Sequence, residues 1–128
     1  MIVGIGVDTV DIDRFARHLE RTPALRERLF VEAERGRPMH SLAARFAAKE
    51  ALIKALGGSG GLCWHDLEVV GGQDQAPWFA ETPALARELA ARGGTDASAV
   101  RTHLTMTHDG GFATAFVILE RMESGGAR

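Results

Sequence analysis

The chain has 128 residues, of which 45% are hydrophobic and 25% charged, and its formal net charge is −2. These values are typical of one globular domain, and they exclude a disordered chain and a strongly basic nucleic-acid-binding protein. The single cysteine excludes an internal disulfide, no apolar run reaches the roughly 20 residues of a membrane span, and "MIVGIGVD" lacks the basic start of a signal peptide. We therefore expect a soluble, cytoplasmic protein.

The first predicted element is a strand over "IVGIGVD", residues 2–8. In a strand, alternate side chains point to opposite faces, so Gly4 and Gly6 share a face with Asp8. Glycines on one face leave room for the close approach of another backbone or of a ligand. Asp8 is the lone carboxylate at the end of this apolar run.

Helices and strands follow without strict alternation, which favours an α+β fold. Asp11 is positioned to cap a first helix, and Thr22 and Pro23 to begin a second. Ser41 is the expected cap of the main helix. The other predicted elements are a strand at "WHDLEVV", a partner strand at "APWFAE", a helix capped by Thr82, and a hairpin of "RTHLTMTH" with "FATAFVILER" around a "DGG" turn.

The main helix is expected to run from its cap at Ser41 to about Leu56 and to stop at Gly57 and Gly58. Its stretch "RFAAKEALIKALGG", residues 45–58, is rich in alanine, so the helix is expected to be packed on more than one side. Lys49 falls within its apolar arc, with Glu50 and Lys54 at the edge. One interpretation is that Lys49 extends past the core to solvent while Glu50 and Lys54 form an exposed ion pair. The other is that these charges belong to a functional site.

Asp8 and Glu50 together favour the second interpretation. Two carboxylates can hold a hard divalent cation such as Mg²⁺, with water and substrate phosphate completing its coordination. Lys54, one helical turn from Glu50, could neutralise charge that builds up on a leaving phosphate. The combination predicts chemistry on a diphosphate or a phosphate ester. By contrast, His40, His65 and His103 show no spacing of a shared metal site and are expected to be structural or surface residues.

Four segments resemble the holo-acyl-carrier-protein synthases, the small bacterial members of the 4′-phosphopantetheinyl transferase superfamily. The segments are "GIGVDTVDIDR", "RFAAKEALIKALG", "WHDLEV" and "HLTMTHDGGFATAFV", in the order of the family and over nearly the whole chain. The resemblance implies a mostly antiparallel sheet packed with a long central helix, in one domain over residues 1–121 with a flexible tail at 122–128. It also implies a homotrimer with active sites between subunits.

The implied reaction transfers 4′-phosphopantetheine from coenzyme A to a serine hydroxyl of apo-acyl-carrier protein and releases 3′,5′-ADP, with Mg²⁺ as cofactor. By position, Asp8 and Glu50 would bind Mg²⁺, and Lys54 would stabilise or protonate the leaving diphosphate oxygen. Either carboxylate, acting through a metal-bound water, could be the base. The residues implied along the nucleotide and its phosphates are Arg45, Lys49, Thr107 and His108.

The chain departs from the family pattern at "VEAE", where Val31 replaces a residue that could cap a helix. We expect a shorter or looser turn there, without a direct consequence for the metal site.

A basic stripe of Arg14, Arg17 and Arg21 lies on the first predicted helix. It is either a solvated face or, as the resemblance implies, the docking surface for an acidic acyl-carrier protein. Two alternatives remain: a transferase of wider specificity, whose members usually carry two such domains, and a non-catalytic module that binds a coenzyme A-like nucleotide or an acidic partner. The module would not need Asp8, Glu50 and Lys54 together.

Overall fold

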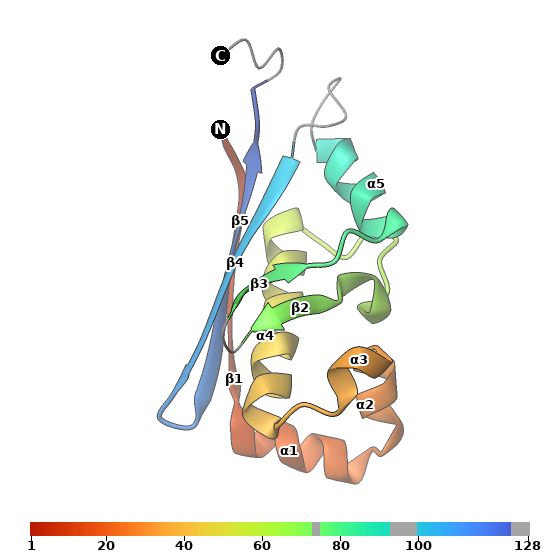
Figure 1. Cartoon of the computed structure of the whole chain (residues 1–128), viewed down its shortest axis with the longest axis vertical. Coiled ribbons are helices and arrows are strands. Elements are labelled where there is room, and N and C mark those ends of the chain that lie inside the picture. The colour runs from red at the N-terminus through yellow and green to blue at the C-terminus, as the bar shows by residue number, and fades with distance from the viewer. Residues whose placement is uncertain (73–74, 93–99, 124–128) are drawn as a thin grey trace.

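The computed structural model describes residues 1–72, 75–92 and 100–123 and is an α+β structure (Figure 1). A three-stranded antiparallel sheet, in the order β1-β5-β4, packs against one long helix, α4, and a small sheet pairs β2 with β3. The elements are β1 (Ile2–Asp11), α1 (Ile12–Arg21), α2 (Ala24–Leu29), α3 (Glu32–Arg35), α4 (Met39–Leu56), the 3₁₀ helix η1 (Trp64–Leu67), β2 (Val69–Gly72), β3 (Gln75–Phe79), α5 (Pro83–Arg92), β4 (Val100–Asp109) and β5 (Phe112–Arg121).

The glycine face of β1 lies directly against α4. A β-carbon on Gly4 would overlap the carbonyl oxygen of Ala55, and one on Gly6 would overlap that of Ala51. The absence of these side chains therefore lets the strand and the helix approach at backbone distance. The prediction that this face admits another backbone is confirmed, and it brings Asp8 beside the middle of α4.

Helix α4 is enclosed by the rest of the molecule, as its alanine content predicted. Ala43, Ala47, Ala48 and Ala51 have no exposed surface, because the main sheet covers one side of the helix and α1, η1 and β2 contact others. The helix ends at Gly57, whose φ of +83° is the left-handed conformation that favours glycine.

Two sequence predictions about caps are wrong, and two are confirmed. Helix α4 begins two residues before Ser41, after Pro38, and Ser41 lies in its first turn. Helix α2 has no side-chain cap, because Thr22 contributes only its backbone carbonyl to that turn. Asp11 caps α1 by accepting from the Arg14 amide at 3.0 Å, and Thr82 accepts from the Leu85 amide at 3.3 Å at the start of α5.

The remaining elements largely follow the predicted order. The β4–β5 hairpin forms as expected, and β3 pairs with β2. The segment "WHDLEVV" is only half a strand, because Trp64–Leu67 forms a 3₁₀ helix in which Asp66 accepts a hydrogen bond from the Cys63 amide at 2.8 Å. Leu67 and Val69 are buried as predicted. The assignment of residues 1–121 to one domain stays a prediction, and positions 124–128 of the proposed tail lie outside the described residues.

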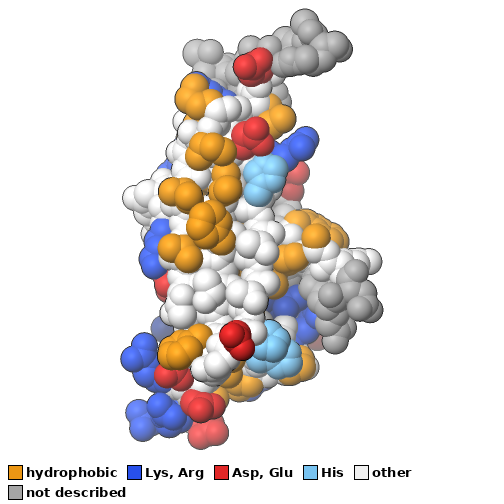
Figure 2. All heavy atoms as spheres, turned by 90° about the vertical axis from the view of Figure 1, so that its left-hand side faces the viewer, with side chains coloured by type: hydrophobic (Ala, Val, Ile, Leu, Met, Phe, Trp, Pro, Cys, Tyr) orange, Lys and Arg blue, Asp and Glu red, His pale blue; other side chains and the backbone are white. Residues whose placement is uncertain are grey.

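The outer face of the main sheet carries exposed apolar side chains (Figure 2). Ile5 is opposite Ile118 and Val7 is opposite Phe116 across the β1–β5 pair. Ile5 is 60% exposed and Val7 48% exposed, although each lies in the middle of a ten-residue strand. Helix α4 covers only the other face. Among the described residues, no helix is long and apolar enough to cross a bilayer.

Candidate functional site

Asp8 and Glu50 line one cavity of about 540 Å³, although 42 positions separate them in the sequence. Asp8 comes from the inner face of β1 and Glu50 from the third turn of α4, and the close strand–helix contact at Gly6 brings them together. Burial raises the pKa of the Glu50 carboxyl above its ordinary value, and the charge of Asp8 raises it further against the opposing effect of Lys54. The charge of Asp8 therefore adds to the effect of burial in making the ionised form of Glu50 less favourable.

Lys54 is paired with Asp8 and not with Glu50. Its Nζ lies 2.9 Å from Asp8 Oδ1 and donates to the Val7 carbonyl at 3.0 Å. The Lys54 side chain is 53% exposed, so its ammonium can also reach a ligand. The interpretation of Glu50 and Lys54 as a surface ion pair is wrong, because the lysine instead joins α4 to β1 at Val7 and Asp8.

Apolar side chains and a set of cations form the rest of this cavity. Phe15, Phe46 and Trp64 form a continuous aromatic wall, with ring centroids of successive pairs 5.1 and 5.5 Å apart. The other lining residues are Thr9, Val10, Asp11, Arg14, His18, Leu25, Arg28 and Leu29. The cavity thus offers an acidic end at β1, an apolar wall and a basic rim on α1 and α2.

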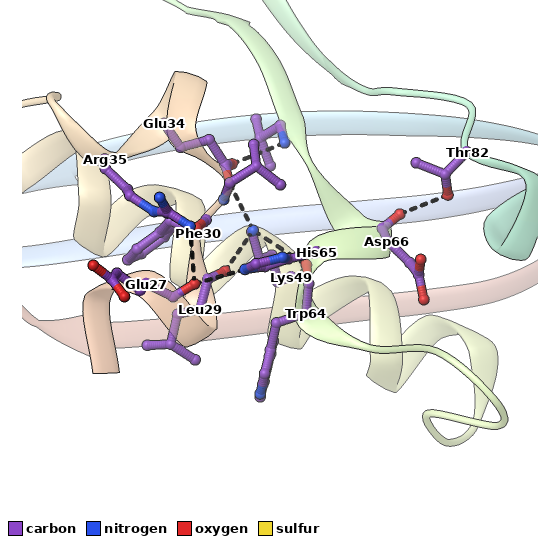
Figure 3. Close-up of polar contacts among 12 residues, drawn as sticks. Glu27, Leu29, Phe30, Glu34, Arg35, Lys49, Trp64, His65, Asp66 and Thr82 are labelled. Carbon is purple, nitrogen blue, oxygen red and sulfur yellow. Dashed lines mark hydrogen bonds and ion pairs between the residues drawn. The ribbon is translucent and has the colours of Figure 1, made fainter. Parts of the chain in front are cut away.

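Lys49 lies elsewhere, at the buried centre of a polar cluster (Figure 3). Its Nζ lies 2.8 Å from Glu34 Oε1, 2.7 Å from the Leu29 carbonyl oxygen and 3.3 Å from the Trp64 carbonyl oxygen. The side chain has no exposed surface, and burial lowers the pKa of Lys49 despite the nearby Glu34 carboxylate. An ammonium group has three N–H donors. All three are used within the protein, so none remains for a phosphate.

Glu34 completes this cluster and was not identified from the sequence. It is 1% exposed, and its carboxylate also accepts from the amides of Val31 at 3.1 Å and Val69 at 3.0 Å. The glutamate therefore ties α3, α4 and β2 together. Helix α3 is short, as the absence of a cap at Val31 predicted, but it is not loose. A lysine buried in the apolar face of a helix needs an acidic partner. This need was the only sign in the sequence that a buried acid such as Glu34 should lie near Lys49.

Arg45, Thr107 and His108 line a second cavity, of about 710 Å³. Arg45 precedes Glu50 by five residues, a rotation of about 140° around an α-helix, so the two side chains point to different sides of α4. Arg45 is 2% exposed and donates to Ser41 Oγ and, at 2.7 Å, to the Gly71 carbonyl. One subunit thus does not bring these three residues into the cavity of Asp8 and Glu50.

The three arginines of the basic stripe are exposed along α1. Arg14 also lines the first cavity, so the stripe begins at its rim. Of the other histidines, His65 contacts the Glu27 carbonyl at 2.6 Å and His103 contacts Glu120 at 2.9 Å. His40 is different, because its ring lies 4.5 Å from that of His108. Among the described residues, no group of three or more His, Cys, Asp or Glu is placed to hold a metal ion.

Together the fold and the site define an α+β protein with a carboxylate pair and a lysine between an edge strand and a central helix. The family model of the 4′-phosphopantetheinyl transferase superfamily matches residues 4–116. The chain is 60% identical over 121 residues to a holo-[acyl-carrier-protein] synthase of Leifsonia xyli subsp. xyli, covering 94% of this chain and 98% of the relative. The chain belongs to this superfamily.

Solved structures agree with this assignment. The holo-[acyl-carrier-protein] synthase from Neisseria meningitidis superposes with a TM-score of 0.82 at 32% identity, over 94% of this chain and all of that one. The structure of the Bacillus anthracis Ames holo-(acyl-carrier-protein) synthase in complex with coenzyme A (3′,5′-ADP) has a TM-score of 0.73 at 30% identity, over 94% and 98% of the two chains. The predicted α+β fold and the family resemblance are confirmed.

Proposed function

We propose that this protein transfers 4′-phosphopantetheine from coenzyme A to a serine hydroxyl of apo-acyl-carrier protein, releasing 3′,5′-ADP. The observation that carries the proposal is the convergence of Asp8 and Glu50 on one cavity, with Lys54 beside Asp8. The names of the relatives support it, as does the coenzyme A bound to the Bacillus anthracis protein. A cytoplasmic location is part of the proposal and is compatible with the exposed free thiol of Cys63.

The two carboxylates fit a magnesium ion. Mg²⁺ usually takes one or two protein carboxylates and keeps the rest of its coordination for water and substrate phosphate. The donor set of Asp8 and Glu50 matches this preference, and both residues line the same cavity. When bound, Mg²⁺ would neutralise charge on the diphosphate of coenzyme A.

The other groups of the first cavity have roles that follow from their positions. Lys54 is exposed enough to exchange its contact with Asp8 for one with a diphosphate oxygen, which stabilises the charge of the leaving group. The aromatic wall of Phe15, Phe46 and Trp64 gives the uncharged pantetheine arm an apolar surface and excludes water beside it. The diphosphate is thereby held at one end of the cavity while the acceptor serine approaches from the other.

The second cavity is proposed to bind the nucleotide of coenzyme A held by a neighbouring subunit. Arg45, Thr107 and His108 are cationic or hydrogen-bonding groups suited to phosphate, but they lie on the other side of α4 from Glu50. A homotrimer in which the first cavity of one subunit faces the second cavity of the next would join them. The uncovered apolar sheet face around Ile5 and Phe116 supports such an assembly. Lys49 is not included, because it is fully buried.

The decisive test is incubation with apo-acyl-carrier protein, coenzyme A and Mg²⁺, followed by intact mass measurement of the carrier. We expect the gain of one phosphopantetheine, and its loss with EDTA, Asp8→Ala or Glu50→Ala. Carriers of both fatty-acid and polyketide synthesis belong in the assay. Binding of coenzyme A without any mass change in several carriers would favour the non-catalytic module instead.

Docking of the acidic carrier on Arg14, Arg17 and Arg21 is supported by their exposure on α1 and by the position of Arg14 at the first cavity. We expect the double variant Arg14→Glu and Arg21→Glu to raise the Michaelis constant for the carrier roughly tenfold, because like charges then meet across the interface. The constant for coenzyme A should stay nearly unchanged. Arg87→Glu, an exposed reversal on α5, is the matched control. Equal losses for both substrates would contradict a docking role.

A further inference from the structure

His40 and His108 form a pair of imidazoles at the rim of the second cavity. Their ring centroids lie 4.5 Å apart with 41° between the ring planes. His40 comes from the first turn of α4 and His108 from the end of β4, and both are exposed. From the sequence, His40 was expected to be a structural or surface residue with no ligand. Its position beside a residue of the proposed nucleotide site suggests a further role.

The surroundings of the pair favour an anion. Arg37, His40, Arg45 and His108 line the cavity, and no described lining residue is acidic. Arg45 Nε is buried and has no hydrogen-bond partner among the described residues. Burial and the nearby Arg37 both lower the pKa of Arg45, against the attraction of Glu34. An anion in this cavity would relieve this mutual repulsion of cations.

The nearest acidic groups do not cancel this charge. Glu34, on α3, is already engaged by the Lys49 ammonium at 2.8 Å and by two backbone amides. Asp109 follows His108 at the exposed hairpin turn. The elements that face His40 across the cavity contribute Gln75 and Pro77 from β3, and Met106 and Thr107 from β4, none of which is charged.

We propose that His40 acts with His108 to bind the 3′-phosphate of coenzyme A. The inference rests on the proposed function and adds a residue to its nucleotide site. Two imidazoles from different elements, 4.5 Å apart at the rim of a cavity lined by Arg37 and Arg45, can both donate an N–H group to the oxygens of one phosphate.

The test compares coenzyme A with dephospho-coenzyme A, which lacks only the 3′-phosphate, by calorimetric titration of the full chain. His40→Gln should weaken binding of coenzyme A by roughly three- to tenfold, the loss of one charge-assisted hydrogen bond. Dephospho-coenzyme A should bind the variant and the unmodified protein alike. His103→Gln, an exposed histidine on β4 paired with Glu120, is the matched control.

Two results would overturn the inference: an unchanged affinity of His40→Gln for coenzyme A, or an equal loss of affinity for dephospho-coenzyme A. A preference for 3′,5′-ADP over AMP, measured by the same titration, tests His40 without any transfer reaction. If the unmodified protein modifies no carrier but His40→Gln still loses the 3′-phosphate preference, the proposed function fails and the binding role of His40 stands. If transfer occurs and the preference is unaffected, only the role of His40 fails.

Discussion

Lys49 and Lys54 show how the same side chain serves two purposes on one helix. Lys49 is fully buried and bonded to Glu34, whereas Lys54 is half exposed and bonded to Asp8. Removing one partner of a buried ion pair leaves the other charge uncompensated, which costs about 3–5 kcal/mol. We therefore expect Lys49→Met to lower the free energy of unfolding by about that amount in urea denaturation. Combining it with Glu34→Gln should restore a large part of the loss.

Lys54→Met is the control for this comparison. Exposed ion pairs contribute about 0–1 kcal/mol, so its unfolding free energy should stay within about 1 kcal/mol of the unmodified protein. Its transfer rate should fall by about 10²–10³, as expected when a group that stabilises transition-state charge is removed. If Lys49→Met unfolds as the unmodified protein does, the buried cluster does not have the structural role assigned to it.

The two lysines also show which parts of the site could be predicted from the sequence and which could not. The pairing of Asp8 with Glu50 was predicted, because two carboxylates suit a divalent cation and the family resemblance implies that these two positions share one. The partner of Lys49 was not, because Glu34 lies in a short irregular segment whose contacts depend on how three elements pack. Helical geometry places Arg45 and Glu50 on different sides of α4. The family resemblance gave all the residues around one nucleotide as a single set, without saying which subunit supplies each residue.

Ionised Glu50 lowers the folding stability of the metal-free protein, and this effect depends on pH. Its pKa is raised, first by burial and then by Asp8, so the unfolded chain loses this proton at lower pH than the folded one. Stability attributable to Glu50 therefore falls as the pH rises through the interval from its ordinary to its raised pKa. In EDTA, Glu50→Gln should raise the melting temperature at pH 7.5 by a few degrees, about 2–4 °C, and leave it unchanged near pH 4.

Magnesium provides the complementary measurement for Glu50. If Asp8 and Glu50 hold Mg²⁺ as proposed, adding the ion should raise the melting temperature of the unmodified protein, because only the folded chain would bring the two carboxylates together. The melting temperature of Glu50→Gln should stay unchanged. Glu20→Gln, an exposed neutralisation on α1, controls for a general change in charge. A lower melting temperature for Glu50→Gln at pH 7.5 in EDTA would be inconsistent with the repulsion inferred here.

At the scale of elements, the site depends on the contact between β1 and α4. Gly6 lies so close to the Ala51 carbonyl that any β-carbon must push the strand away from the helix. Overpacking of this kind costs about 3 kcal/mol where the neighbour is rigid backbone, so we expect Gly6→Ala to lose about that much stability. Because Asp8 is two residues further along the strand, transfer activity should fall even at temperatures where the variant is folded.

Gly36→Ala is the matched substitution for this prediction. A β-carbon at Gly36 meets no atom within 4 Å, and its φ of −82° suits alanine. Its unfolding free energy should change by no more than about 0.5 kcal/mol. We compare the denaturation curves and transfer rates of Gly6→Ala and Gly36→Ala. The difference between the two variants gives the effect of the strand–helix contact, apart from the general effect of replacing a glycine. Equal stability of both variants would refute the importance of the contact.

At the scale of the whole molecule, the sheet has one covered and one uncovered face. Ile5 and Val7 in the middle of β1 and Phe116 in the middle of β5 are exposed on the outer face, and a cluster of exposed apolar side chains is typical of a surface that binds another protein. Two cavities on different sides of α4 each hold part of the expected ligand set. A ring of identical subunits joins unlike surfaces of neighbours, and can therefore complete every site at once.

Complementation between inactive variants tests this arrangement. Glu50→Gln disables the first cavity, and His108→Glu places a carboxylate in the second. Each variant alone should be inactive. Mixed trimers can be isolated through a different affinity tag on each variant. Whichever variant is present twice, one interface then joins the intact first cavity of a His108→Glu subunit to the intact second cavity of a Glu50→Gln subunit. They should show about one third of the unmodified activity, because one of three heterologous interfaces is complete.

A second pair of variants decides whether such recovery requires two cavities from different subunits. In mixed trimers of Glu50→Gln subunits and Asp8→Asn subunits, every subunit has a defect in its first cavity. No arrangement of these subunits gives an intact first cavity, so these trimers should remain inactive. Sedimentation velocity must show the same trimer for every preparation. Recovery in the control pair would mean that Asp8 and Glu50 do not act in the same cavity of one subunit. No recovery in the Glu50→Gln and His108→Glu trimers would mean that each subunit completes its own site, and the nucleotide would then have to be bound without the second cavity of a neighbour.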